Sequence, residues 1–217
     1  MLHTYRAVNK GANTGEITIY GNIGSSFWDS EGVSAAQFKK DLRSLGAVKN
    51  IDLRLNSDGG VITEAQAMYN LLVEHPASVH VHIDGIAASA ASFLAMAGDK
   101  ITIAEGGFFM IHNARGGVMG QAEDFEAAAQ VLRTMNATIR KKYADRTGQP
   151  LDQIRKWMDA ETWFDGVQAV ELGFATDLTE NMKMVACCSS SLLNGYCNVP
   201  QNVRRNRNKA LERLTNV

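Results

Sequence analysis

Residues 79–96 read VHVHIDGIAASAASFLAM, and this stretch decides the expected fold. The alternation of apolar and polar residues over 79–83 is typical of a strand, and Gly85 follows it closely. The small residues over 89–96 favour a helix packed closely inside a core. A strand that leads directly into a helix is the repeating unit of α/β proteins, so we expect that class.

The same alternation of strand and helix continues on both sides of this stretch. Ser34 and Thr63 are expected to cap the two helices that precede it, because a side-chain oxygen at that position can accept a free backbone N–H. The other expected strands cover 17–20, 51–55, 101–103 and 108–111, and shorter helices are expected over 151–158 and 167–172. We find no internal repeat of fixed period.

The longest helical pattern covers 123–143, and we expect a helix over about 121–143. A helix of about 23 residues spans roughly 35 Å, about the width of a small domain. Its apolar residues are too many for a fully solvated helix, so we expect another subunit to cover some of them. The apolar residues that carry this argument are Phe125, Val131, Leu132, Met135 and Ile139.

Composition excludes several functional classes. The chain has 217 residues with 45% hydrophobic and 21% charged residues, which is ordinary for a globular protein. A formal net charge of −1 argues against nucleic-acid binding. The longest small and apolar run, 85–98, is too short and too rich in Gly and Ser to span a bilayer. With no targeting signal in view, we expect a soluble, non-secreted protein.

The cysteines and histidines give little reason to expect a metal. Cys187, Cys188 and Cys197 are odd in number, which argues against a disulfide framework, and their spacing is a poor zinc pattern. His80 and His82 alternate on one strand face and would suit a metal pair, but the sequence shows no third ligand beside them. We therefore expect no metal and no organic cofactor.

The two ends of the chain differ from its middle. Residues 1–14 form a short N-terminal segment before the first expected core strand. Over 179–217 periodicity fades, and the run 198–208 is polar and basic. This end is expected to be a mobile tail, either simply solvated or used as a docking or packaging segment.

Three segments could carry chemistry, although each has an ordinary structural explanation. Ser89 follows a tight turn of small residues at the start of a helix, where a substrate carbonyl could approach it, but small residues also suit close packing. Gly59 and Gly60 could expose backbone N–H groups to an oxyanion, or could simply make a turn. His112 follows an apolar strand, where a histidine is often structural.

Taken together, these segments resemble one family. Residues 85–89 (GIAAS), then 110–113 (MIHN), with 56–60 (NSDGG) upstream, resemble the ClpP serine peptidases. The resemblance runs from about Gly15 to Leu178 and includes matches at 116–117, 147–149 and 169–174. It implies an α/β superhelix of repeated β-β-α units of the ClpP/crotonase type, with a protease domain over 15–178 and a projecting handle helix over about 121–143.

One branch of the family looks most similar. Residues 15–24 (GEITIYGNIG) and 159–163 (DAETW) resemble the ClpP-like head maturation proteases of tailed phages and prophages. This resemblance implies capsid or scaffold proteins as polypeptide substrates.

The resemblance also implies a role for individual residues. Ser89 matches the nucleophile and His112 the general base, while Ser92, one helical turn away, does not match the motif. The backbone N–H groups of Gly60 and Ala90 would form the oxyanion hole. The segment that would pair with an extended substrate is Asn113, Ala114, Arg115, Gly116 and Gly117, with Val61 on the opposite wall of the cleft.

Two positions depart from the family pattern. Glu161 stands where most relatives have Asp as the third triad member, and a glutamate can still orient an imidazole. Asp159 is the competing carboxylate. Asp58 stands where relatives usually have Pro, which adds a negative charge near the oxyanion hole.

The function implied is that of an ATP-independent core endopeptidase that works through an acyl-enzyme. Its partners would be a polypeptide substrate, further copies in a ring or double ring, and in some systems a Clp-type ATPase. Two alternatives stay open: an inactive assembly protein on the same fold, and an acyl-CoA enzyme of the related crotonase type.

Overall fold

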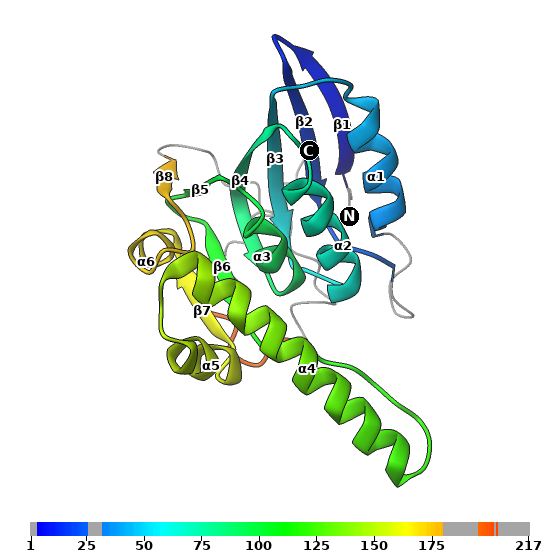
Figure 1. Cartoon of the computed structure of the whole chain (residues 1–217). Coiled ribbons are helices and arrows are strands. Elements are labelled where there is room, and N and C mark those ends of the chain that lie inside the picture. The colour runs from blue at the N-terminus through cyan, green and yellow to red at the C-terminus, as the bar shows by residue number, and fades with distance from the viewer. Residues whose placement is uncertain (1–3, 26–31, 180–194, 202, 204–217) are drawn as a thin grey trace, which may run out of the picture.

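The computed structural model describes residues 4–25, 32–179, 195–201 and 203. One mixed sheet forms the centre of the molecule, with the order β1-β2-β3-β4-β5-β8, while β6 joins β4 to β7 off this path (Figure 1). The strands are β1 (Thr4–Gly11), β2 (Thr14–Tyr20), β3 (Asn50–Ser57), β4 (Ser78–Ala88), β5 (Lys100–Ala104), β6 (Phe108–Ile111), β7 (Thr162–Asp165) and β8 (Asp177–Thr179). The helices are α1 (Ala35–Ser44), α2 (Ile62–Val73), α3 (Ala90–Ala95), α4 (Ala122–Thr147), α5 (Leu151–Asp159) and α6 (Gly166–Glu171).

The strands β2, β3, β4, β5 and β8 pair in parallel, and helices connect most of them, which confirms the predicted α/β class. The long strand β4 changes partner along its length. Its first half pairs with β5, and its last residues, 86–88, pair with β6 instead. This change of partner brings the end of β4 beside the end of β6.

The two faces of the sheet differ in chemistry. Leu53 and Leu55 on β3 and Val81 on β4 are fully or almost fully buried, on the face covered by α1, α2 and α3 (Figure 1). The alternate residues on the same strands, such as Asp52 and His82, point to the other face because side chains alternate along a strand. Every residue of α3 is buried, as its small side chains predict.

The helix starts were predicted with mixed success. Ser34 caps α1 as expected, and its hydroxyl accepts the N–H of Gln37 at 3.1 Å. The expected cap at Thr63 is wrong, because α2 begins earlier and Val61 is its N-cap residue, with no side-chain cap bond. In the N-terminal segment, β1 forms an antiparallel hairpin with β2 that the sequence analysis did not anticipate.

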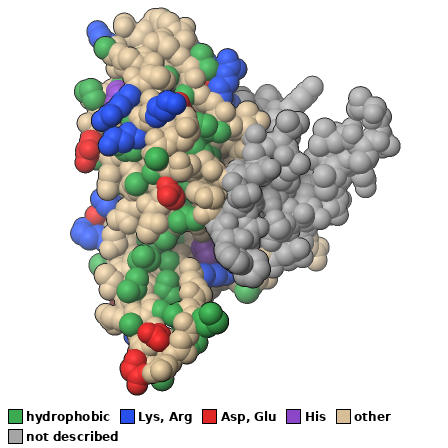
Figure 2. All heavy atoms as spheres, turned by 90° about the vertical axis from the view of Figure 1, so that its right-hand side faces the viewer, with side chains coloured by type: hydrophobic (Ala, Val, Ile, Leu, Met, Phe, Trp, Pro, Cys, Tyr) green, Lys and Arg blue, Asp and Glu red, His purple; other side chains and the backbone are tan. Residues whose placement is uncertain are grey.

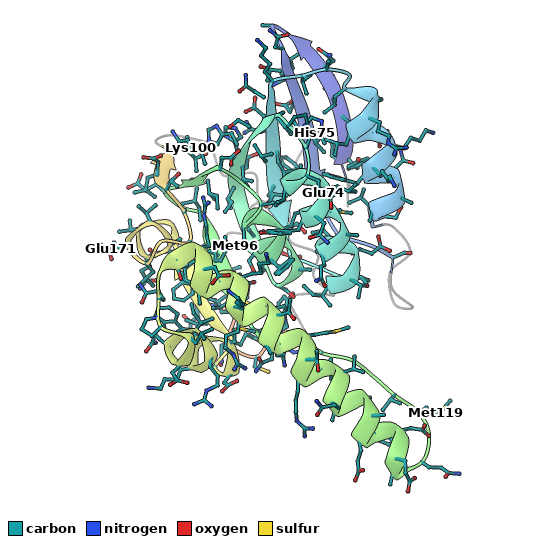
Figure 3. The ribbon with its side chains drawn as sticks, in the orientation of Figure 1. Glu74, His75, Met96, Lys100, Met119 and Glu171 are labelled. Carbon is teal, nitrogen blue, oxygen red and sulfur yellow. The ribbon has the colours of Figure 1, made fainter. Side chains whose placement is uncertain are left out.

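The long helix α4 runs to Thr147, beyond its expected end at Tyr143, and projects away from the sheet (Figure 1). Met119, at the far end of the connection that leads into it, lies well away from the sheet (Figure 3). Phe125 and Val131 are about half exposed. Figure 2 shows hydrophobic side chains gathered over the part of the surface where this helix projects.

Much of the predicted tail, including Cys187 and Cys188, lies outside the described residues. Its described part, 195–201 with Val203, packs against the domain, and Tyr196, Val199 and Val203 join a small buried cluster with β4 and β6. Cys197 is an exposed free thiol. Within the described ranges, we find no helix that combines the length and apolar character needed to cross a membrane.

Candidate active site

Ser89 stands at the junction of β4 and α3, in a backbone conformation that side chains rarely adopt. Its φ is 55° and its ψ is −122°, while its N–H donates to the carbonyl of Met110 at 3.0 Å. A positive φ at a residue other than glycine costs energy and is found mostly where a function requires it. This sharp turn presents the hydroxyl away from the buried helix.

His112 is placed beside Ser89 by the pairing of two strands. Ala88 on β4 is in register with Met110 on β6, so the residues just beyond each strand end come together. The Oγ of Ser89 lies 2.7 Å from the Nε2 of His112, which is hydrogen-bonding distance. The structure therefore brings together two residues that are far apart in the sequence.

Burial, followed by the positive charge of Arg115, lowers the pKa of His112 to about 4, although the charge of Glu161 acts in the opposite direction. The imidazole is therefore neutral at neutral pH and free to accept a proton. Its Nδ1 is buried and has no hydrogen-bond partner in the described part of the chain. Nδ1 is the nitrogen that a triad acid would contact, and no described residue forms a hydrogen bond with it.

The two candidate acids differ in burial. Glu161 is 6% exposed, whereas Asp159 is on the surface and accepts a hydrogen bond from the Nδ2 of Asn113 at 2.8 Å. One carboxylate oxygen of Glu161 forms an ion pair with the guanidinium of Arg115, and the other accepts the backbone N–H of Asn198 at 2.8 Å. Glu161 thus lies at the site but is held by these two groups.

The glycine turn before α2 lies directly against Ser89. The φ of Gly59 is 106°, and a Cβ there would lie 2.7 Å from the carbonyl oxygen of Ala88 and 3.0 Å from the nitrogen of Ala90. A Cβ on Gly60, whose φ is 140°, would lie 2.1 Å from the carbonyl oxygen of Ile23. Only glycine allows the backbone to come this close at both positions. The N–H group of Gly60 belongs to this turn, and the N–H group of Ala90 belongs to the start of α3, against which Gly59 lies.

The segment predicted to bind substrate is extended and open. Residues 113–117 follow β6 without helix or strand of their own, and 115–117 are exposed. The N–H of Ala114 donates to the side chain of Asn136 at 2.7 Å, which ties the segment to α4. Val61 is half-buried at the start of α2, where its N–H donates to the carbonyl of Ile23 at 2.8 Å.

Ser92 has a different environment from Ser89. Its hydroxyl is fully buried and lies 2.6 Å from the carbonyl oxygen of Ser89, 2.7 Å from that of Met110 and 2.8 Å from the hydroxyl of Tyr143. These contacts fix the start of α3 and connect it to α4. Ser92 therefore has the surroundings of a structural residue.

The C-terminal segment contributes to this site, which did not follow from the sequence. The ring of Tyr196 packs edge-on against His112 with centroids 5.4 Å apart, and its hydroxyl donates to the carbonyl of Asp58 at 2.6 Å. The guanidinium of Arg115 lies 5.5 Å from the centre of the same ring. No motif marks Tyr196, because it comes from a stretch with little periodicity.

Comparisons with known proteins point to one family. A family model described as Clp protease matches residues 12–182. Proteins named ATP-dependent Clp protease proteolytic subunit 1 from Mycobacterium bovis and Mycobacterium tuberculosis are 34% identical to this chain over 131 residues, which is 59% of the chain. The protein of the same name from Mycobacterium leprae is 33% identical over 130 residues. The matched region spans 65% of the length of each of these relatives.

Proposed function

Because the chain belongs to the Clp protease family, we propose that it is a serine endopeptidase in which Ser89 is the nucleophile and His112 the general base. The observation that carries this proposal is the 2.7 Å contact between the Ser89 Oγ and the His112 Nε2. The strained turn at Ser89 supports it, because such strain persists where a function uses it.

The reaction follows from this contact. The Ser89 hydroxyl attacks a peptide carbonyl carbon while its proton moves to the Nε2 of His112. The protonated imidazole then gives that proton to the leaving amine, which leaves an ester on Ser89. A water molecule, deprotonated by the same imidazole, hydrolyses the ester and frees the enzyme.

We assign Glu161 as the triad acid. It is the buried carboxylate of the two candidates, and its charge favours the protonated form of His112. To contact the Nδ1 of His112, it must exchange its present bonds to Arg115 and Asn198 for that nitrogen. Its role in the reaction is to orient the imidazole and stabilise the cation that forms.

The substrate would lie between the glycine turn and the segment after His112. Gly60 and Ala90 would each donate a backbone N–H to the oxyanion, because Gly60 follows Gly59, which lies against Ser89, and Ala90 directly follows Ser89. Residues 113–117 would pair with an extended peptide. This segment is extended, its residues 115–117 are exposed, and the side chain of Asn136 accepts one of its backbone N–H groups, that of Ala114. Val61 would form the opposite wall.

We propose that the protein works as a closed ring or double ring, with α4 as the contact between copies. The half-exposed Phe125 and Val131 on a projecting helix support this arrangement, because exposed apolar clusters mark association sites. Light scattering after size exclusion should give a mass of six or more subunits. Val131→Glu should reduce that mass, while Gln130→Glu, on the same exposed helix, should leave it unchanged. A monomer that is fully active on peptides would contradict the proposal.

For the biological role, we propose an ATP-independent core peptidase that acts on capsid or scaffold proteins during phage head maturation. The resemblance of residues 15–24 and 159–163 to phage proteases supports this role. The names of the mycobacterial relatives describe ATP-dependent subunits, so a Clp-type ATPase is the alternative partner. Mass spectrometry of candidate capsid and scaffold proteins after incubation with the enzyme, with and without such an ATPase, tests both.

A serine-directed fluorophosphonate probe tests the proposed chemistry. The wild-type protein and Ser92→Ala should be labelled, and Ser89→Ala should not be, although it should fold normally. Peptide mapping should place the adduct on Ser89. A wild-type protein that resists labelling would favour an inactive assembly protein. Binding of coenzyme A in calorimetry, without labelling, would favour an acyl-CoA enzyme instead.

A further inference from the structure

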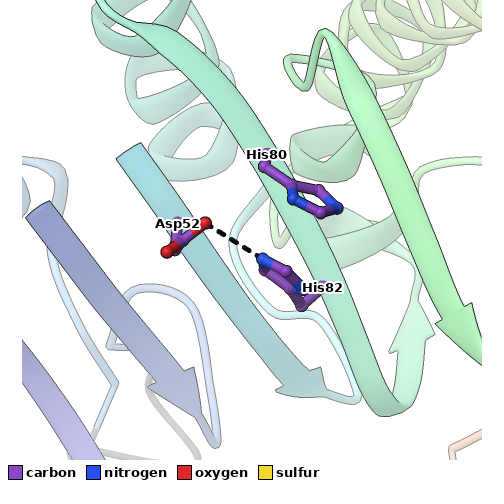
Figure 4. A group of neighbouring side chains, drawn as sticks. All are labelled: Asp52, His80 and His82. Atoms are coloured by element: carbon purple, nitrogen blue, oxygen red, sulfur yellow. Dashed lines mark hydrogen bonds and ion pairs between the residues drawn. The ribbon is translucent and has the colours of Figure 1, made fainter. Parts of the chain in front are cut away.

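A second group of titratable side chains lies on the sheet face opposite to α1, α2 and α3 (Figure 4). His80 and His82 are two residues apart on β4, so both point to this face. Asp52 on β3 is in register with His80, which places its carboxylate beside both imidazoles. One donor atom from each of the three residues lies within 4.8 Å of the other two.

These side chains are already held in place. The Nε2 of His82 lies 3.1 Å from the Oδ1 of Asp52, and its Nδ1 lies 3.2 Å from the hydroxyl oxygen of Thr102 on β5. The same hydroxyl lies 3.2 Å from the Nε2 of His80. Residues of three adjacent parallel strands therefore fix the two rings. Thr102 contacts the Nδ1 of His82, the nitrogen opposite the one that faces Asp52, and metal-binding histidines are commonly oriented by such a contact to their second nitrogen.

We infer that Asp52, His80 and His82 form a binding site for one divalent transition-metal ion, with Zn²⁺ as the best match. Two imidazole nitrogens and one carboxylate oxygen are ligands that Zn²⁺ prefers, and three protein ligands leave a fourth position for water. Ligand atoms at about 2.1 Å from a tetrahedral ion are roughly 3.4 Å apart, which small side-chain rotations can reach from the present distances. The sequence did not reveal this site because Asp52 is far from the histidines along the chain.

Nearby charges are compatible with a cation at this position. The guanidinium of Arg54 is paired with the carboxylate of Asp84 at 2.6 Å, so part of its charge is compensated. The hydroxyl of Tyr20 donates to the same carboxylate at 2.6 Å. Lys100 forms an ion pair with Asp177 at 3.3 Å.

Calorimetric titration of the chelator-treated full chain with Zn²⁺ tests this site. We expect one ion per chain, at least a tenfold loss of affinity in His80→Ala and His82→Ala, and about a tenfold loss in Thr102→Val. His75→Ala is the matched control, because His75 lies beyond the end of α2 (Figure 3) and its Nδ1 accepts the N–H of Ala77. If a histidine variant fails to fold, Asp52→Asn replaces it in the test and should likewise weaken Zn²⁺ binding.

Two further readouts complete the test. Zn²⁺ should raise the melting temperature of the wild type more than that of His82→Ala, because an ion that binds only the folded state stabilises it. When Co²⁺ is bound in place of Zn²⁺, the absorption spectrum should show visible bands typical of nitrogen and oxygen ligands. An absence of binding, equal affinity in all variants, or a strong near-ultraviolet band from thiolate ligands would overturn the inference.

A separate observation concerns the C-terminal segment over the active site. The carbonyl of Gly195 accepts a bond from the Arg115 guanidinium, and Tyr196 covers His112 on one side. The side chain of Asn198 donates to the carbonyl of Ala160 at 2.6 Å, while its backbone N–H donates to Glu161. This segment and Arg115 together occupy both carboxylate oxygens of the proposed acid.

We also propose, resting on the function above, that residues 195–201 form an autoinhibitory segment. In the observed arrangement the Ser89–His112 bond is formed, but the bond from His112 to the acid is not, and Asn198 provides one of the bonds that hold Glu161 away. Asn198 is thus a positioning residue that acts through Glu161. Displacement of the segment would free Glu161 to turn toward the Nδ1 of His112.

Two variants of Asn198 isolate this contact. Asn198→Pro removes the N–H that binds Glu161, while Asn198→Ala removes only the side chain and is the matched control. We expect a several-fold faster fluorophosphonate labelling and a higher kcat/KM in Asn198→Pro and in Tyr196→Ala than in Asn198→Ala. The apparent pKa of His112 in the pH profile should also rise, because the freed carboxylate favours the imidazolium.

The outcomes separate this inference from the proposed function. Equal labelling rates and unchanged pH profiles in all three variants would overturn the autoinhibitory role and leave the peptidase intact. An absence of labelling in the wild type and in every variant would overturn the peptidase, and the autoinhibitory role with it.

Discussion

His112 and His82 each stand near a carboxylate, but the two imidazoles differ in how many of their nitrogens are bound. His112 contacts Ser89 through Nε2, while its buried Nδ1 has no partner in the described chain. His82 has both nitrogens engaged, one by Asp52 and one by Thr102.

If our two proposals hold, the difference separates a site prepared for reaction from a site prepared for binding. A buried polar atom without a partner costs free energy, so its persistence in a fold points to a partner that arrives later. At the Nδ1 of His112 that partner would be Glu161, while the proton from Ser89 would go to the other nitrogen, Nε2. Around His82 the network is already satisfied, and an ion would replace bonds that exist.

The largest expected effect tests which carboxylate completes the reactive site. Glu161→Ala should lower turnover by up to about 10⁴-fold, because the imidazole loses both its orientation and the stabilisation of its cation. Glu161→Asp should keep part of the activity. Asp159→Ala is the matched control and should stay close to wild type in peptide hydrolysis, since its side chain is on the surface. If Glu161→Ala kept its activity and Asp159→Ala lost it, Asp159 rather than Glu161 would be the triad acid.

The next effect concerns pH and stability. Burial, followed by the charge of Arg115, lowers the pKa of His112 to about 4, whereas an unfolded histidine titrates near 6.5. Between these values the unfolded chain binds more protons than the native one, so stability is full above about pH 6.5 and falls as pH falls through this window. The loss is at most about 3.4 kcal/mol, for a difference of about 2.5 pKa units at 1.36 kcal/mol per unit.

Urea unfolding of the wild type and of His112→Gln over the same pH range measures this contribution. The free energy of unfolding should fall more steeply with acidification in the wild type. Equal slopes in the two proteins would show that His112 does not have a lowered pKa in the folded state.

A smaller effect distinguishes the two serines at the start of α3. Ser92→Ala should reduce the free energy of unfolding by about 1–3 kcal/mol, because it leaves the buried hydroxyl of Tyr143 without its partner. Ser89→Ala should cost less, since its hydroxyl faces the cleft. Chemical denaturation of both variants checks this order, and the reverse order would mean that the two hydroxyls have been assigned the wrong roles.

The smallest effect is expected at the sheet-face histidines. Without metal, Asp52→Asn should change the free energy of unfolding by no more than about 1 kcal/mol, because the contact between Asp52 and His82 is partly exposed. The difference between variant and wild type should widen when Zn²⁺ is added. Thermal melts of the variant and the wild type, with and without Zn²⁺, measure both differences. A large loss of stability in Asp52→Asn without metal would mean that Asp52 and His82 serve to stabilise the fold rather than to bind an ion.

Local features of the fold could be predicted from the sequence. The strand predicted over 108–111 matches β6, and Ser34 caps α1, because alternation and capping depend on a few neighbouring residues. The proximity of Ser89 and His112 did not follow from any pattern. It was expected only from the family resemblance, since it depends on the register of β4 with β6.

Other features depend on long-range contacts that periodicity does not encode. The approach of Asp52 to the two histidines requires the register of β3 with β4. The position of Tyr196 against His112 requires a segment from near the C-terminus to return to the cleft. The hairpin of β1 was missed because its residues are mostly polar or exposed and show no strand pattern.

The unequal lengths of β4 and β6 have a consequence for how the proposed activity would be lost. Ser89 follows the eleven-residue strand β4, which is paired on both sides, whereas His112 follows the four-residue strand β6, whose other neighbour β7 is equally short. Local opening is easiest where few contacts must break. Transient fraying of β6 and β7 would carry His112 away while Ser89 stays anchored. If the proposed peptidase activity holds, the protein should therefore pass on warming through a reversibly inactive, largely native form before it unfolds.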